Sequence, residues 1–307
     1  MEATRLVIGP LWGSGVPERV AAVPGVDATI VGDLGAVAGA LARVPILVTF
    51  RWDDSWLSPD LRWVQSVSSG IDQFPIEALR ANGTVLTSGR GLQHVPVAEH
   101  AMGLLLAMTR GIALAAVRQP RHEWRWSRVD EIEGKTMGIL GLGTIGEAIA
   151  VRAAAFGMTV IGTKRSPEAY RGVASDVLPP GSTLEVFRRS DVVVIALPGS
   201  PDTERLVGRS EIEALAGGWL VNVGRGGVVD QDALVAAMRE GTLAGAALDV
   251  FPEEPLPEDS ALWDLPGVLI SPHQAGASPG FGDALAGLVA RNLDAYHGQA
   301  AWVNRVV

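Results

Sequence analysis

The sequence predicts an α/β fold in which two domains are each built around a parallel sheet. Short apolar runs rich in β-branched residues alternate with helix-compatible segments along most of the chain, which is typical of parallel strands joined by helices. The chain has 307 residues. At roughly 100–200 residues per domain, this length suggests two domains, each with its own hydrophobic core. Apolar residues make up 48% and charged residues 19% of the sequence. This composition argues against a disordered chain or a coiled coil.

The first series of predicted strands lies in the N-terminal third. It comprises Leu6–Ile8, Ala28–Val31, Ile46–Phe50, Trp63–Val67 and Val85–Thr87. Segments at 36–43 and 76–81, between these strands, are compatible with helices. We expect a small open βαβ domain that ends near Gly91.

A longer helix is predicted next, from about residue 97 to 117, with Pro96 in its first turn. The segment 118–128 that follows is rich in Arg and contains Trp124 and Trp126. We interpret it as a surface linker or as an oligomer contact in which the Trp side chains are buried. Contact with nucleic acid is the alternative interpretation.

A second strand series follows this segment. Its strands are predicted at Thr136–Leu140, Thr159–Gly162, Val192–Ala196, Trp219–Val223, Ala246–Val250 and Val268–Ser271, and its helices at Ile145–Phe156, Leu184–Arg188, Ser210–Leu215 and Gln231–Glu240. A final helix, about 282–296, comes after both series and could pack on the first domain. We therefore expect a discontinuous domain, 1–93 with 283–307, a second domain, 94–282, and a cleft between them.

Charge and composition limit the classes of partner. Asp and Glu number 34 and Lys and Arg 25, so the formal net charge is −9, and we expect neither nucleic acid nor a membrane as partner. The chain has no Cys, which excludes disulfides and thiolate sites; no metal site is expected. The N-terminal sequence lacks the layout of a signal peptide, and the longest uncharged stretch, 265–282, contains three prolines. We therefore expect a cytoplasmic protein.

A glycine-rich turn follows the first strand of the second series. Gly141, Gly143 and Gly146 have the G-x-G-x-x-G spacing, and the turn opens an apolar helix through Thr144 and Ile145. The first glycine permits a tight turn, the second lets backbone N–H groups approach a pyrophosphate, and the third lets the helix pack close to the strand. An ordinary strand–helix turn can also be rich in glycine. Because strand and helix are both in place, we favour a dinucleotide site.

Three polar residues each follow a later strand of this series: Arg225, Glu254 and His273. In an open parallel sheet, ligands bind beyond the carboxyl ends of the strands, so the three could lie in one crevice. Singly, each has an ordinary explanation as a turn arginine, a solvated loop acid or a capped loop histidine. Together they supply a cation for a carboxylate, an acid/base group and a carboxylate that orients this group.

Several motifs of the chain resemble those of the D-isomer-specific 2-hydroxyacid dehydrogenases, the family of glyoxylate/hydroxypyruvate reductases and D-3-phosphoglycerate dehydrogenase. The matching stretches are 98–100 (AEH), 133–146 (EGKTMGILGLGTIG), 197–203 (LPGSPDT), 222–230 (NVGRGGVVD), 247–256 (ALDVFPEEPL) and 271–276 (SPHQAG). They follow the family's order over about residues 96–280. The first 95 residues match mainly in pattern, through 68–72 (SSGID).

The resemblance implies an enzyme that transfers a hydride between NAD(P)H and C2 of a 2-oxo acid or D-2-hydroxy acid, with reduction favoured. Arg225 corresponds to the arginine that binds the substrate carboxylate, His273 to the general acid/base and Glu254 to its carboxylate partner. The backbone of Ser69 and Gly70 corresponds to the loop that meets the carboxylate from the first domain.

The resemblance also implies the roles of the domains and the lining of the cofactor site. The domain 1–93 with 283–307 would be a flavodoxin-like substrate domain, and 94–282 a Rossmann-like NAD(P)-binding domain in a homodimer. Besides the glycine loop, the residues implied to contact the cofactor are Leu197, Pro198, Thr203, Val223, Gly224, Arg225, Asp249, His273 and Gly276. Asp249 would face the nicotinamide amide.

Some positions depart from the family pattern or stay open. Serines occupy 68–69, where many members have small apolar residues. Arg51 is either a second contact for the carboxylate or a surface charge. His94 lies near the nicotinamide or in a loop, and we favour the loop.

Three other functions are compatible with a chain of this kind. A formate- or phosphite-type dehydrogenase is disfavoured, because formate enzymes pair their histidine with glutamine and this chain has Glu254. A D-3-phosphoglycerate dehydrogenase-like enzyme is one alternative. An NAD(P)-sensing protein similar to the corepressors that share this fold is another.

The residues at the end of the second strand of this series predict that the protein prefers NADP(H) as cofactor. NAD(H) is the other possibility. Proteins that bind NAD usually place an acid roughly 20 residues after the glycine loop. Here the residues are Thr163, Lys164, Arg165 and Ser166, with no acid among them. The two cations would attract a 2′-phosphate and the two hydroxyls could hydrogen-bond to it. The alternative is a solvated basic turn.

Overall fold

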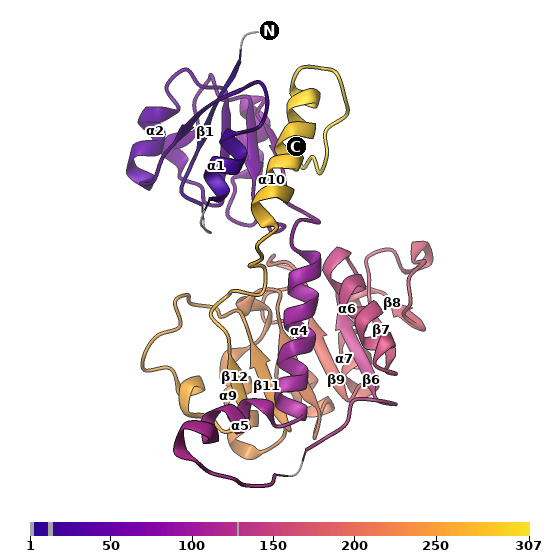
Figure 1. Ribbon diagram of the computed structural model, residues 1–307. Helices are drawn as coiled ribbons and strands as arrows, with labels where there is room; N and C mark the ends of the chain where they lie inside the picture. Colours follow the sequence, from indigo (N-terminus) through magenta and orange to yellow (C-terminus); the bar gives the residue numbers. More distant parts are fainter. Residues whose placement is uncertain (1–2, 12–14, 128) are drawn as a thin grey trace. The chain divides into compact units, whose positions relative to one another are not determined.

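The computed structural model describes residues 3–11, 15–127 and 129–307 (Figure 1). The chain divides into two compact units, 1–93 with 277–307 and 94–276. The second boundary therefore lies earlier than the expected 282/283. The reason is that Phe281 and Gly282, which begin the last helix, pack against the first unit through its apolar core and Arg19.

The first unit is a five-stranded parallel sheet covered by helices on both faces. Its strands are β1 (Thr4–Ile8), β2 (Val26–Ile30), β3 (Ile46–Thr49), β4 (Trp63–Ser66) and β5 (Val85–Thr87). Their order, β2-β1-β3-β4-β5, is the flavodoxin-like one. The helices are α1 (Val16–Ala21), α2 (Val37–Ala40), α3 (Ile76–Asn82) and α10 (Phe281–Tyr296). The apolar core is split by the sheet into one cluster beneath α1 and α10 and another beneath α2 and α3.

A buried polar network fastens α10 to this sheet. Trp63 Nε1 donates to Thr87 Oγ1 at 2.8 Å, and this hydroxyl donates to Gln65 Oε1 at 2.8 Å. Asn292 of α10 donates to the same oxygen at 2.9 Å. Since all four side chains are buried and hydrogen-bonded, they fix the register of the last helix without leaving a polar atom unsatisfied.

The second unit is a seven-stranded parallel sheet. Its strands are β6 (Thr136–Leu140), β7 (Thr159–Thr163), β8 (Asp176–Leu178), β9 (Val192–Ile195), β10 (Trp219–Asn222), β11 (Gly245–Leu248) and β12 (Val268–Ile270). The strands lie in the order β12-β11-β10-β9-β6-β7-β8. From β6 the chain proceeds to one edge of the sheet through β7 and β8, and from β9 it proceeds to the other edge. Ligands bind at such a switch point, here between β6 and β9, in doubly wound sheets. The parallel pairing in both units confirms the predicted fold class.

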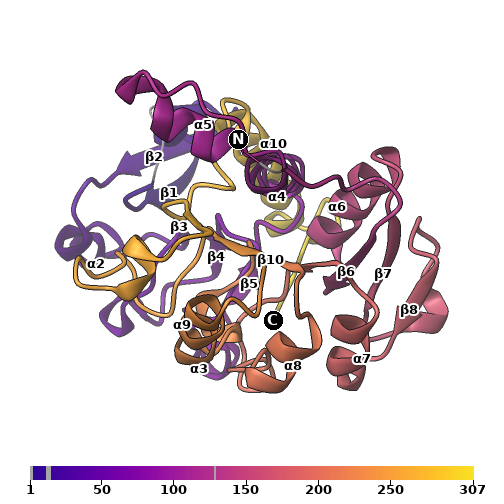
Figure 2. The ribbon, with the colours of Figure 1, turned by 90° about the horizontal axis from the view of Figure 1, so that it is seen from below.

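Helices cover both faces of this sheet (Figure 2). One face carries α4 (His94–Thr109) and α6 (Thr144–Ala155), and the other carries α7 (Thr183–Arg188), α8 (Arg209–Ala214) and α9 (Gln231–Glu240). Short 3₁₀ turns complete the structure at Leu34–Ala36, Asp54–Trp56, Gln119–Arg121, Pro167–Ala169, Pro180–Ser182, Gly226–Val228 and Ala261–Asp264.

The helix expected over 97–117 is two helices. The first ends at Thr109, and the second, α5 (Ile112–Arg118), starts after Gly111 at a positive φ of 67°. This left-handed residue breaks the continuous pattern, because an α-helix requires negative φ at every position. Within the described ranges no single helix is long and apolar enough to cross a membrane. Together, α4 and residues 112–121 are long and apolar enough, but the chain bends by 68° at the break between them.

The segment around α5 exposes an unusual amount of apolar surface. No residue of α5 is buried, and its Ile112 and Val117 are more than half exposed. Beyond it Trp124 and Trp126 are 104% and 85% exposed. Both indoles therefore lie on the surface of the single chain; Arg128, the last residue of the basic segment, lies outside the described residues.

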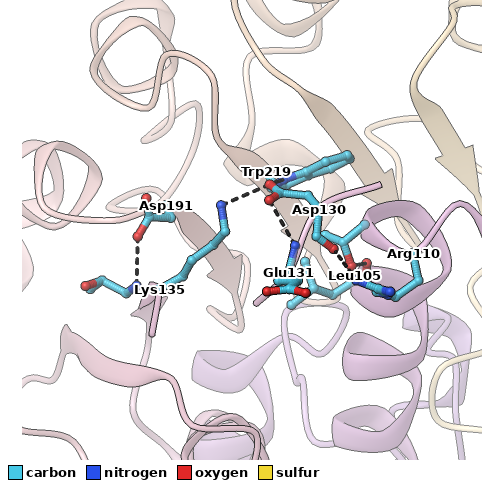
Figure 3. A network of polar contacts seen from close by, with 9 residues as sticks. Leu105, Arg110, Asp130, Glu131, Lys135, Asp191 and Trp219 are labelled. Atoms are coloured by element: carbon cyan, nitrogen blue, oxygen red, sulfur yellow. Dashed lines mark hydrogen bonds and ion pairs between the residues drawn. The ribbon is translucent and has the colours of Figure 1, made fainter. Parts of the chain in front are cut away.

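Asp130 anchors the return of the chain from this segment to the sheet (Figure 3). Its Oδ2 accepts hydrogen bonds from Lys135 Nζ at 2.9 Å and Trp219 Nε1 at 3.5 Å, and its carbonyl accepts one from Arg110 at 3.0 Å. Burial raises the pKa of Asp130, but the bonds from Lys135, the backbone and Trp219 outweigh it and hold the pKa below its ordinary value. Asp130 therefore connects the end of α4, through its carbonyl, to the start of β6 and to β10, through its carboxylate.

Candidate active site

The glycine loop is a compact turn between β6 and α6. Gly141 has a φ of 96°, in the region that favours glycine. A Cβ on Gly146 would lie 2.1 Å from the carbonyl oxygen of Gly141, so any side chain there would push the helix from the strand. The first N–H groups of a helix have no partner within the helix and favour an anion. With Gly143, Thr144 and Ile145 at the start of α6, the cradle fits a pyrophosphate.

The last residue of β7, Thr163, and the three residues that follow it divide into two pairs. Thr163 is buried and its Oγ1 accepts a hydrogen bond from Gly141 N at 3.1 Å, while Lys164 Nζ donates to the carbonyl of Leu142 at 2.6 Å. Both side chains thus hold the glycine loop. Arg165 and Ser166 are exposed.

The loops that follow β9 and β10 pack directly together. Thr203 closes the first loop by donating from Oγ1 to the carbonyl of Pro198 at 2.8 Å. A Cβ on Gly224 would lie 2.6 Å from the carbonyl oxygen of Leu197, so only glycine permits this approach. Val223 is buried beneath the contact. The two loops form a continuous border beside the point where the strand order reverses.

Arg225 is half-buried and is held by a turn that Asn222 closes. Asn222 Oδ1 accepts from Gly224 N, and its Nδ2 donates to the carbonyl of Arg225, each at 3.0 Å. Arg225 Nη1 donates to the Gly224 carbonyl at 3.0 Å. Gly226 lies so close to Phe251 that a Cβ would be 1.9 Å from the Phe251 carbonyl carbon. Asn222 begins the motif 222–230, but the motif by itself indicates no role for this residue.

His273 and Glu254 are paired. His273 Nδ1 lies 2.6 Å from Glu254 Oε2, and Glu254 Oε1 accepts from Phe251 N at 2.9 Å. Burial raises the pKa of Glu254, but the bonds from His273 and Phe251 outweigh it, with a smaller contribution from the charge of Arg225, so the pKa lies below its ordinary value. The side chains are 43% and 34% exposed, which keeps the pair accessible.

Asp249, by contrast, is 1% exposed and holds the turn that carries His273. Its two oxygens accept from the backbone N–H groups of Gln274 and Ala275, both at 3.0 Å, and Oδ1 also accepts from the Ser271 hydroxyl. His100 Nε2 of α4 lies 2.7 Å from Ser271 Oγ. Burial raises the pKa of Asp249, but the bonds from His100, Ser271 and the backbone outweigh it and lower the pKa.

In the first unit, Ser69 and Gly70 lie in the loop after β4. Ser68 Oγ donates to the Gly70 carbonyl at 2.6 Å, and Gln73 Nε2 donates to Ser68 Oγ at 3.2 Å and to the carbonyl of Phe50 at 2.7 Å. The serine at 68 therefore braces the loop from within. Gln73, which the sequence analysis missed, ties the loop to the end of β3.

Two further expectations concern Arg51 and His94. Arg51 is exposed just beyond β3, and because β3 and β4 run in parallel it lies at the same sheet edge as the Ser69 loop. The expectation that His94 lies in a loop is wrong: His94 is the first residue of α4. The helix starts early because Pro96, which needs no backbone donor there, is accommodated in its first turn.

The carboxyl edge of the seven-stranded sheet thus gathers most of the expected site residues. The groups lie at 141–146 after β6, 197–203 after β9, 223–225 after β10, 249–254 after β11 and 271–276 after β12. Ser69, Gly70 and Arg51 belong to the other unit. Among the described ranges there is no group of three or more His, Asp or Glu side chains that could hold a metal ion.

Comparison with known proteins agrees with this arrangement. Residues 102–275 match the family described as D-isomer specific 2-hydroxyacid dehydrogenase, NAD binding domain. Glyoxylate reductase of Thermococcus gammatolerans is 36% identical over 251 residues, which cover 78% of this chain and 74% of that protein. D-3-phosphoglycerate dehydrogenase of Methanocaldococcus jannaschii is 35% identical over 241 residues, 76% of this chain, but the chain spans only 45% of that protein.

Among solved structures, the NADPH-dependent glyoxylate/hydroxypyruvate reductase of Sinorhizobium meliloti in complex with NADP and malonate superposes with a TM-score of 0.86 at 30% identity. The superposition covers 100% of this chain and 97% of that one. These matches confirm the resemblance first seen in the motifs. The chain belongs to the D-isomer specific 2-hydroxyacid dehydrogenase family.

Proposed function

We propose that this protein reduces a 2-oxo acid to a D-2-hydroxy acid with NADPH, acting in the cytoplasm as a homodimer. The observation that carries the proposal is the hydrogen-bonded His273–Glu254 pair at the sheet edge that also holds Arg225 and the glycine loop. An acid/base group, a carboxylate-binding cation and a pyrophosphate cradle at one edge are the parts that such a reduction needs.

In the proposed reaction Arg225 binds the substrate carboxylate through its planar guanidinium, which can donate two parallel hydrogen bonds. His273 faces Glu254 with Nδ1, so the opposite nitrogen, Nε2, gives the proton to the carbonyl oxygen. The Glu254 carboxylate stabilises the protonated imidazole and fixes its orientation. When bound, NADPH would supply the hydride for C2, so that the C=O group would become CH–OH.

We assign the remaining substrate contacts to the first unit. The backbone N–H groups of Ser69 and Gly70 are proposed to bind the carboxylate, in a loop that Ser68 and Gln73 brace. Arg51, at the same sheet edge, is proposed as a second cation for this carboxylate.

The cofactor is proposed to lie along the carboxyl edge of the seven-stranded sheet. The loop Gly141–Gly146 would hold its pyrophosphate, and Arg165 with Ser166 would hold the 2′-phosphate of NADPH. Thr163 and Lys164 would act through the glycine loop, to which both are bonded. The contacts of the nicotinamide half are assigned to Leu197, Pro198, Thr203, Val223, Gly224, Asp249 and Gly276.

Steady-state kinetics with glyoxylate, hydroxypyruvate and larger 2-oxo acids test the proposal, with NADPH and NADH each followed by absorbance. We expect turnover with at least one acid and a higher kcat/KM with NADPH. His273→Ala should abolish most of this turnover. His297→Ala removes an exposed imidazole of the first unit that is bonded to Thr4, and it serves as control. Cofactor binding without turnover of any 2-oxo acid would refute an enzyme and favour a sensor of NAD(P)H.

The dimer is proposed to form through α5 and the segment that follows it. The exposed indoles of Trp124 and Trp126 and the apolar face of α5 are surface that a monomer rarely exposes together. Light scattering should give twice the chain mass for the wild type, and Trp124→Ala with Trp126→Ala should shift the mass towards the monomer. Trp263→Ala removes an indole that is 51% exposed elsewhere and should leave the mass unchanged. A monomeric wild type would exclude the dimer.

A further inference from the structure

We propose that His100 and Ser271 are positioning residues for the acid/base step: with Asp249 they form a hydrogen-bond chain that holds the turn carrying His273. The inference rests on the proposed function and names further residues for the same site. The chain of bonds runs from His100 Nε2 to Ser271 Oγ at 2.7 Å, and from the Ser271 hydroxyl to Asp249 Oδ1.

The turn needs such a support because His273 has an unfavourable backbone conformation. Its φ is 48°, in the left-handed region that residues with a Cβ rarely occupy. Asp249 holds the turn at three backbone donors: its carbonyl accepts from His273 N at 2.8 Å, and its carboxylate accepts from Gln274 N and Ala275 N at 3.0 Å each. The position of the imidazole therefore depends on where the Asp249 carboxylate lies.

The direction of the bonds gives His100 and Ser271 their role. A serine hydroxyl has one hydrogen, and here it goes to Asp249, so Ser271 Oγ accepts from His100 Nε2–H. His100 Nε2 also lies 3.4 Å from Asp249 Oδ1. In a nucleophilic triad the order differs, because the serine gives its hydrogen to histidine and the carboxylate contacts the histidine. Ser271, which is 4% exposed, is therefore not activated as a nucleophile.

The bond from His100 connects two segments that are far apart in sequence. His100 lies on α4, whose Ala98, Ala101 and Met102 are buried in the core against the sheet, so its backbone is a rigid reference. Ser271 directly follows β12, just before the chain leaves this unit. The buried helix thereby fixes the otherwise strained turn that presents His273 to Glu254.

Four variants test the role of this hydrogen-bond chain in the reaction. Ser271→Ala and His100→Leu each remove one donor, and we expect kcat for reduction to fall about tenfold, the loss that one hydrogen bond to a charged group implies. The KM for NADPH should stay within about twofold, because the glycine loop is untouched. His100→Gln retains an N–H at the place of Nε2 and should restore most of kcat. Ser190→Ala removes a hydroxyl that donates within the same unit to Val186, and should behave as wild type.

Hydrogen exchange of the protein without cofactor provides a second readout, independent of turnover. The amides of 271–276 should exchange about tenfold faster in Ser271→Ala and His100→Leu, and at the wild-type rate in His100→Gln and Ser190→Ala. Unchanged kcat and unchanged exchange in the first two variants would overturn the inference. The inference would also be overturned if exchange became faster throughout the unit while kcat fell and the KM for NADPH rose in parallel. That result would mark a purely structural role. If the wild type reduces no 2-oxo acid, the proposed function fails, and the exchange of 271–276 still decides whether these bonds hold the turn.

Discussion

The pairing of Glu254 with His273 makes Glu254→Gln the most informative substitution in the protein. The amide has the size of the carboxylate, and its oxygen can keep the bond from Phe251 N, which is 2.9 Å long in the wild type. At the other position an NH₂ group replaces Oε2, which lies 2.6 Å from His273 Nδ1. The variant therefore keeps the size of the side chain and the bond from Phe251 N, while a neutral donor takes the place of the charged acceptor that faces Nδ1.

The magnitude follows from the kind of bond that is lost. A hydrogen bond to a charged group contributes about 1.5–3 kcal/mol and one between neutral groups about 0.5–1.5 kcal/mol. Glu254 is 34% exposed, so solvent screens the charge and the lower end of the difference, about 1 kcal/mol, applies. We therefore expect kcat for reduction to fall roughly five- to tenfold.

The lowered pKa of Glu254 adds a stability measurement. A carboxyl whose pKa is depressed in the folded chain contributes stability that is present above its ordinary pKa of 4.5 and is lost as the pH falls through the lowered value. Melting temperatures measured between about pH 6 and 3 should therefore drop more steeply for the wild type than for Glu254→Gln. Glu253→Gln removes the neighbouring charge and serves as control. Identical kcat values and identical melting curves for wild type and Glu254→Gln would remove Glu254 from the proposed acid/base pair.

Three other substitutions test separate parts of the molecule. Arg225→Lys keeps the charge but not the planar fork, so both KM for the 2-oxo acid and kcat should worsen, by about tenfold each; near-normal kinetics would mean that another cation holds the carboxylate. Arg165→Ala should lower kcat/KM for NADPH by about one to two decades and hardly affect NADH, with Arg188→Ala as control; equal losses with both cofactors would contradict a 2′-phosphate contact. Asp130→Asn should lower the melting temperature by about 2–4 °C, corresponding to about 1 kcal/mol, whereas Glu131→Gln should not. An unchanged melting temperature in Asp130→Asn would show that the network of Figure 3 contributes no net stability.

The larger elements of the fold were predictable because their apolar runs are long and regular. The sequence predicts β6 with the bounds that the structure has, and α9 likewise. The short elements escaped prediction for local reasons. β8 has three half-buried residues at the edge of the sheet and includes Asp176, so it shows neither an apolar run nor alternation. α1 begins with Val16 and Pro17 after a left-handed Gly15, a sequence that reads as a turn.

The candidate site divides in the same way. Arg225, Glu254 and His273 could be found because each bears a reactive group just after a predicted strand. The residues that hold them could not: Asn222 acts on a turn next to it, whereas His100 contacts Ser271 across 171 residues of sequence. Gln73 reaches back to Phe50 from another strand end. Such contacts are set by which strand ends lie side by side, and a single sequence gives no direct signal of that.

The discontinuity of the first unit has a consequence for its biosynthesis. Its strands leave the ribosome first, but α10, which covers Leu6, Ile8 and Val48 through Leu285 and other apolar residues, is made only after residues 94–276. At about 5–20 residues per second, this face of the nascent sheet waits on the order of 10–40 s for its cover. During that interval the second unit is being made, while the first exposes an apolar face of the kind that chaperones bind. The last folding step of the first unit is therefore the docking of α10 onto strands that were made before residues 94–276.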